Sequence, residues 1–123
     1  MDFKNLLRFI PTSHFLSNWS RHGLTENDMI DLEYTIMAAP VSAPVISGTG
    51  GLRKLRFSPS RSGRGKSGAF RTCYFYFAAD GVVFLVDIYG KNEKADLTKA
   101  ERNAFAALAP SLEAVARRGN PKR

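Results

Sequence analysis

Residues 69–89 constrain the fold of this chain more than any other stretch. Ala69 to Ala78 is rich in aromatic and other β-favouring residues, and Val82 to Tyr89 is almost continuously apolar. The connection Ala79-Asp80-Gly81 has the composition of a tight turn. The apolar run predicts a strand buried on both faces, and the short connection predicts that the two strands pair as a hairpin.

A third strand is expected just before this hairpin. Leu52 to Ser58 alternates in polarity, with Leu55 and Phe57 on one side and Lys54 and Arg56 on the other. Together the three segments predict an antiparallel meander that carries cations on one of its faces.

Helices are predicted both before and after the meander in the sequence. The N-terminal part predicts a short strand at Arg8-Phe9-Ile10, a helix that begins at Thr12 or Ser13 and ends at His22-Gly23, and a second helix from Thr25 to about Ala38. A capping box at Thr98-Lys99-Ala100-Glu101 predicts a last helix, which Pro110 is expected to kink or interrupt.

This order of elements predicts an α+β fold. The length of 123 residues predicts one domain over residues 1–116, and residues 117–123 are expected to form a disordered basic tail.

Positive charge is concentrated in the middle of the chain. The sequence has 18 Lys and Arg against 11 Asp and Glu, a net charge of +7. Residues 34–79 contain no acidic residue and seven basic ones, namely Arg53, Lys54, Arg56, Arg61, Arg64, Lys66 and Arg71. A field of one sign attracts polyanions, so this segment indicates a nucleic acid or an acidic protein as the partner.

Several kinds of site do not fit the sequence. Gly63 to Ser67 resembles the end of a phosphate-binding loop, but Ser60 stands where the first glycine is required, and a strand follows instead of a helix. Gly48-Thr49-Gly50-Gly51 fails as a dinucleotide fingerprint for the same reason. With two histidines and one cysteine, we expect no metal, no cofactor and no intramolecular disulfide.

The remaining titratable groups are expected to be structural. His14 and His22 are predicted to be surface or capping residues away from the basic strands, and Cys73 a small buried hydrophobic residue. No apolar run is long enough to cross a bilayer, and the N-terminus does not resemble a signal peptide, so a cytoplasmic location is expected.

Cations gathered on a sheet suit work on RNA. A meander can bring Lys54, Arg56, Arg71, Tyr89 and Lys91 to one surface. RNA is cut when its own 2′-hydroxyl attacks the neighbouring phosphate, which requires in-line positioning, a base, an acid and positive charge, without a metal. Arginine supplies permanent charge, and clustered lysines can act as acid or base. From the residues alone, RNA binding and RNA cleavage both stay open.

Three motifs occur in order: Gly48 to Phe57 (GTGGLRKLRF), Gly68 to Phe77 (GAFRTCYFYF) and Ile88 to Leu97 (IYGKNEKADL). Together they resemble the RelE/ParE toxin superfamily, and within it the HigB-like branch, over roughly residues 8–116. The resemblance implies two N-terminal helices and a C-terminal helix packed on a small, twisted antiparallel sheet of about four strands. It also implies a type II toxin that enters the ribosome and cuts messenger RNA, and an antitoxin partner, often a helix-turn-helix protein of the HigA-like kind.

Site residues follow from the same resemblance. Lys54 and Arg56 resemble the residues that hold the substrate and assist proton transfer, and Arg71 resembles the arginine that stabilises the scissile phosphate. Lys91 lies in the basic motif that ends the last strand. Tyr89, two residues earlier, comes from the strand pattern and not from the resemblance, and completes the predicted catalytic set. Five further cations are expected to contact RNA or the ribosome: Arg53, Arg61, Arg64, Lys66 and Lys94.

The resemblance leaves two questions open. RelE has an arginine where this chain has Asn92 and a tyrosine where it has Asp96-Leu97, so the general base and acid are not carried over. Tyr89, Lys91, Glu93 and Lys94 are the alternatives. Two other functions also remain: inhibition of DNA gyrase, as in ParE-like toxins, and RNA or ribosome binding without cleavage.

Overall fold

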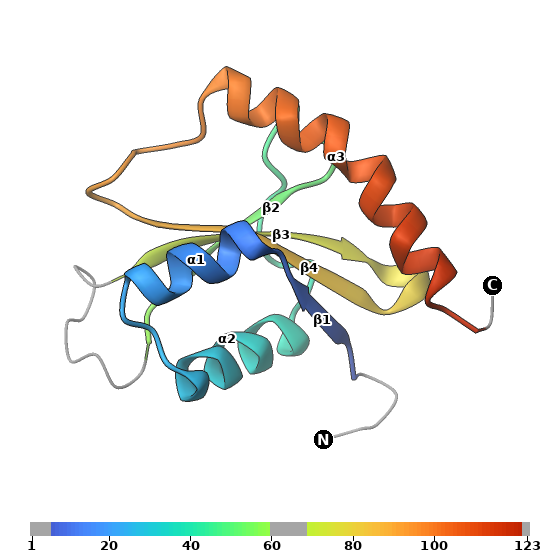
Figure 1. Ribbon diagram of the computed structural model, residues 1–123, viewed down its shortest axis with the longest axis horizontal. Coiled ribbons are helices and arrows are strands. Elements are labelled where there is room, and N and C mark those ends of the chain that lie inside the picture. Colours follow the sequence, from blue (N-terminus) through green and yellow to red (C-terminus); the bar gives the residue numbers. More distant parts are fainter. Residues whose placement is uncertain (1–5, 60–68, 122–123) are drawn as a thin grey trace.

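A four-stranded sheet with helices on both faces forms the core of the computed structural model, which describes residues 6–59 and 69–121 (Figure 1). Within that part of the chain, no helix has the length and apolarity of a membrane-spanning segment. The elements follow one another as β1 (Arg8–Pro11), α1 (Ser13–Arg21), α2 (Glu26–Ala38), β2 (Arg53–Phe57), β3 (Phe70–Phe77), the 3-10 turn η3 (Ala78–Asp80), β4 (Val82–Gly90) and α3 (Lys99–Arg118).

The strand order is β1-β4-β3-β2. The pairs β2–β3 and β3–β4 are antiparallel, which confirms the predicted meander and the α+β class. The pair β1–β4 is parallel, so the sheet is mixed and not wholly antiparallel as predicted. β1 reaches β4 across most of the chain, and no hairpin turn fixes its direction, so local patterns in the sequence do not reveal this pairing.

Each face of the sheet is covered by different helices (Figure 1). On one face α1 and α2 contribute Phe15, Trp19, Leu32 and Ile36 to a core that includes Phe57 and Ile88. On the other face α3 contributes Ala109 and Ala116 to a second core that includes Cys73, Val86 and Tyr89. The continuous apolar run of β4 is explained by this arrangement, because its side chains enter both cores in turn.

The helix ends form as their capping residues predict. Thr12 caps α1, and the boxes Thr25/Asp28 and Thr98/Glu101 cap α2 and α3. Pro110 does not interrupt α3, which continues to Arg118. Proline at this position removes the hydrogen bond to the carbonyl of Ala106 without ending the helix.

The predicted boundary after residue 116 lies inside this helix. Arg117 and Arg118 belong to the last turn of α3 and not to a tail. Positive charges at a helix C-terminus are favourable because they face the negative end of the helix dipole, which gives a physical reason for the longer helix. Residues 122 and 123 lie outside the described part of the chain.

Candidate functional site

The register of β2, β3 and β4 aligns three of the predicted site residues in one row. Arg56 lies opposite Arg71, and Arg71 lies opposite Tyr89. Residues that face each other in an antiparallel pair project from the same side of the sheet, with neighbouring strands about 5 Å apart. Tyr89 belongs to the core beneath α3, so the whole row projects from that face.

A second row lies two residues along the same strands. Here Lys54 is opposite Cys73, and Cys73 is opposite Asp87, next to a bulge in the β3–β4 pairing. The Nζ of Lys54 lies 3.5 Å from Oδ1 of Asp96, which comes from the turn before α3. The Leu97 N–H and then the charge of Lys54 lower the pKa of Asp96. Lys54 is thus paired with a carboxylate that the sequence analysis did not place in the site.

Arg71 occupies the centre of the first row and is half-buried. Among residues 6–59 and 69–121, its guanidinium makes no hydrogen bond or ion pair. Arg56, its neighbour on β2, is exposed. Two guanidinium groups on adjacent strands can therefore approach one anionic group between them.

The side chain of Tyr89 is buried too deeply to contact a substrate directly. Its side chain is 2% exposed, and its hydroxyl is buried without a hydrogen-bond partner in the described part of the structure. Burial raises the pKa of Tyr89 above its ordinary value, and the negative charges of Asp96 and Asp87 raise it further. The phenol is therefore neutral at physiological pH and is a poor candidate for the general base.

Lys94 supports this tyrosine from the turn after β4. Its Nζ lies 4.6 Å from the centre of the Tyr89 ring, 2.7 Å from Oε2 of Glu101 and 3.5 Å from Oδ2 of Asp87. Burial alone would lower the pKa of Lys94, but these carboxylates outweigh it and raise that pKa. The structure therefore holds Lys94 half-buried between β4 and the start of α3.

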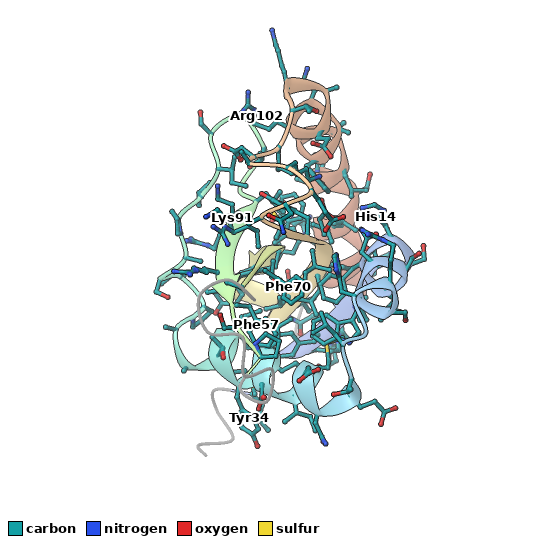
Figure 2. The ribbon with its side chains drawn as sticks, turned by 90° about the vertical axis from the view of Figure 1, so that its left-hand side faces the viewer. His14, Tyr34, Phe57, Phe70, Lys91 and Arg102 are labelled. Carbon is teal, nitrogen blue, oxygen red and sulfur yellow. The ribbon has the colours of Figure 1, made fainter. Side chains whose placement is uncertain are left out.

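Glu93 fixes the turn that carries Lys91. One carboxylate oxygen accepts a hydrogen bond from the Gly90 N–H at 2.7 Å, and the other accepts one from Arg21 at 2.6 Å. Although burial opposes it, these two bonds hold the pKa of Glu93 at about 2. Lys91 is exposed in this turn, and in Figure 2 it lies between the labelled Phe70 and Arg102.

The two histidines lie nearer to the sheet than predicted. Nε2 of His14 is 3.2 Å from Oδ1 of the buried Asp87, on the opposite side of Figure 2 from Lys91. His22 is the C-cap of α1, as one prediction had it, but its ring packs edge-on against Phe70 in β3. Its Nε2 also lies 2.7 Å from Oε1 of Glu93, without the alignment of a hydrogen bond. The prediction that both lie away from the basic strands is therefore wrong.

The reason is that β1 stops pairing with β4 at Leu85, which leaves the edge of β4 beyond it without a strand. The side of α1 that carries His14, Asn18, Arg21 and His22 faces this edge, where these residues contact Asp87 and Glu93. The spacing i, i+4, i+7, i+8 in α1 was the signal that could have placed them on one face.

Arg53 is not brought to the two rows. It alternates with Lys54 along β2, and its Nη1 donates hydrogen bonds to the carbonyl oxygens of Val41 at 3.1 Å and Ala43 at 2.7 Å. Arg53 therefore anchors the segment between α2 and β2. Arg61, Arg64 and Lys66 lie outside the described residues.

Cys73 is fully buried, which confirms its predicted place in the core. Burial raises the pKa of its thiol to about 12. In the described ranges, no three His, Cys, Asp or Glu side chains are grouped closely enough to hold a metal ion.

Comparisons with known proteins agree with this architecture. A family model described as the RelE toxin of the RelE/RelB toxin-antitoxin system matches residues 15–119. Among solved structures, a double arginine-to-alanine variant of E. coli toxin RelE in the free state matches with a TM-score of 0.52 and 16% sequence identity. That match covers 85% of this chain and 97% of the other, and at this identity it concerns the fold.

Proposed function

Because this chain belongs to the RelE family of toxins from toxin-antitoxin systems, we propose that it is a ribosome-dependent endoribonuclease that blocks translation by cutting messenger RNA. The observation that carries the proposal is the shared face of Arg56 and Arg71 on adjacent strands, with Lys54 two residues away on β2. The motifs at residues 48–57, 68–77 and 88–97 favour the HigB-like branch.

The proposed chemistry uses the RNA's own 2′-hydroxyl as nucleophile. Arg56 and Arg71 hold the scissile phosphate and stabilise the charge that develops on it. Lys54 and Lys91 are the groups that transfer protons, and Asp96 positions the Lys54 ammonium. Tyr89 acts as a positioning residue, since its buried side chain lies beside Arg71 on the neighbouring strand and its hydroxyl is buried away from substrate.

The other predicted RNA contacts receive different roles. Arg61, Arg64 and Lys66 remain proposed contacts to RNA or the ribosome. Lys94 and Arg53 have structural roles, because carboxylates bind Lys94 and backbone carbonyls accept hydrogen bonds from Arg53. The substrate, a messenger bound to ribosomes, implies action in the cytoplasm.

An antitoxin partner follows from the family, and we propose a helix-turn-helix protein of the HigA-like kind. An acidic segment of this partner would neutralise the face that carries Arg56 and Arg71 or block entry to the ribosome. Purification of the two proteins as a complex, and rescue of growth by co-expression, are the expected results. A chain that is harmless when expressed alone would contradict this part of the proposal.

The test is to map messenger ends after brief induction and in a purified translation system. The proposal predicts new ends within translated messengers, and no ends when ribosomes are omitted. Broken DNA with intact messenger would instead indicate a gyrase inhibitor of the ParE kind. Arrested translation without cleaved ends would indicate an RNA- or ribosome-binding protein without nuclease activity.

A further inference from the structure

A hollow of about 480 Å³ lies beside the Lys54–Asp96 pair, and apart from Asp96 its lining residues take no part in the chemistry proposed above. One wall is the loop before β2, with Ser47 and Gly48. The other wall comes from the turn before α3 and its first turns, with Asp96, Lys99, Arg102 and Asn103. The volume is in the range of sites that bind small molecules, about 300–1,000 Å³.

The loop wall is rigidly held. The Thr49 hydroxyl is fully buried, donates to the Ile46 carbonyl at 2.6 Å and accepts from the Leu52 N–H at 3.0 Å. Gly50 has φ +73°, and a Cβ there would lie 3.1 Å from the Cβ of Ala109 in α3. The glycines that fail as a dinucleotide motif thus form a tight turn pressed against α3, and the hollow is formed before any ligand arrives.

The α3 wall supplies recognition groups of two kinds. Lys99 and Arg102 are cations whose side chains make no hydrogen bond or ion pair within the described ranges. The Asn103 amide, exposed at the same wall, offers a donor and an acceptor together. Cations suit a phosphate, and an amide suits the hydrogen-bonding edge of a nucleobase.

The hollow continues directly from the candidate site, because Asp96 belongs to both. Lys54 and Arg56 are two residues apart on β2, a distance of about 7 Å along the strand. An RNA strand whose phosphate lies at Arg56 and Arg71 and that runs along β2 past Lys54 would bring a neighbouring nucleotide to the hollow.

We propose that this hollow is a subsite for one nucleotide that flanks the scissile phosphate of the messenger. Asn103 contacts the edge of its base, and Lys99 and Arg102 contact its phosphate. The proposal rests on the nuclease function. In it, the α3 wall of the hollow helps to determine where the messenger is cut.

The test compares Asn103→Ala and Arg102→Ala with Arg117→Ala. Arg117 is an exposed arginine on the same helix, about 22 Å from Arg102 along the axis, and its loss changes the net charge by as much as Arg102→Ala does. Cleavage is measured in single turnover on ribosomes that carry messengers with each of the four bases at the positions around the cut. The melting temperature of every variant is recorded. Asn103 is exposed and Arg102 is half-buried, so both variants are expected to fold.

Asn103→Ala is expected to reduce the preference at one flanking position at least about fivefold. Arg102→Ala is expected to weaken cleavage about fivefold or more while the base preference is kept, and Arg117→Ala to match the wild type. If the wild type cuts and Asn103→Ala retains the wild-type preference at every position, the subsite is wrong and the nuclease function stands. A uniform loss in both wall variants would indicate a ribosome contact and would also overturn the subsite. If the wild type cuts nothing, the nuclease function fails and the subsite fails with it.

Discussion

Arg53 and Arg71 are arginines on neighbouring strands for which the structure predicts opposite consequences of loss. Arg53→Ala removes two hydrogen bonds, to the carbonyls of Val41 and Ala43, from a guanidinium on the α2 side of the sheet. We count the exposed bond to Val41 at about 0.5 kcal/mol and the part-buried bond to Ala43 at about 1.5 kcal/mol, so the total is about 2 kcal/mol. For a chain of this size that corresponds to a fall of roughly 8 °C in Tm.

Arg71→Ala removes no hydrogen bond or ion pair that the structure describes. We expect less than about 1 kcal/mol of lost stability, chiefly from lost packing of the side-chain stem. In the proposed mechanism the same change removes a preformed donor to the phosphorane. Cleavage is then expected to fall about 10²–10³-fold.

The assay pairs thermal unfolding with single-turnover cleavage of messenger on purified ribosomes. Arg53→Ala should melt early and cut at the wild-type rate per folded molecule, whereas Arg71→Ala should melt near the wild type and cut very slowly. A folded Arg71→Ala protein that cuts as fast as the wild type would refute the assignment. So would a loss of activity in Arg53→Ala, under conditions where it is folded, as large as that in Arg71→Ala.

Three further predictions concern the supports of the site. Glu93→Gln should reduce stability near neutral pH and make the free energy of unfolding depend less on pH, because a carboxylate with a folded pKa of about 2, below the ordinary 4.5, stabilises the fold above about pH 5 and loses this effect as the pH falls toward 2. Chemical denaturation across this pH range measures the effect, and wild-type and variant stabilities that change in parallel with pH would contradict it. Gly50→Ala should cost about 1 kcal/mol or more, because φ is +73° and the new methyl group meets Ala109, and an unchanged Tm would contradict this. Tyr89→Phe removes a buried hydroxyl that has no partner among the described residues, so stability should hold or rise and cleavage should change less than about threefold. A loss near 100-fold would mean that the hydroxyl takes part in the chemistry.

Local patterns in the sequence were sufficient to predict most of the fold. The capping boxes at Thr25 and Thr98 placed the starts of α2 and α3, and alternation in residues 52–58 placed Lys54 and Arg56 on one face. The tight turn before Val82 predicted the β3–β4 pairing. These features depend on neighbours within a few residues, which is why a single sequence reveals them.

Contacts between distant segments were not predictable in the same way. The parallel β1–β4 pair, the Lys54–Asp96 pair and the His14–Asp87 contact join residues between 42 and 74 positions apart. In the sequence, Lys94 resembles an ordinary solvated lysine in a turn. Its position over Tyr89 and beside Glu101 depends on the tertiary structure. Arg53 was expected to contact RNA, because its charge alone does not show that it lies on the opposite face of β2 from Lys54 and donates to the carbonyl oxygens of Val41 and Ala43.

The central claim is that cations on adjacent strands hold one and the same phosphate. A double-mutant cycle measures this most directly, with single-turnover cleavage by the wild type, Arg56→Ala, Arg71→Ala and the double variant on programmed ribosomes. If both guanidinium groups act on one phosphorane, the two losses are non-additive, with a coupling between about 0.5 and 3 kcal/mol. Losses that add within about 0.3 kcal/mol would mean that the two arginines act at separate places, and would contradict the account.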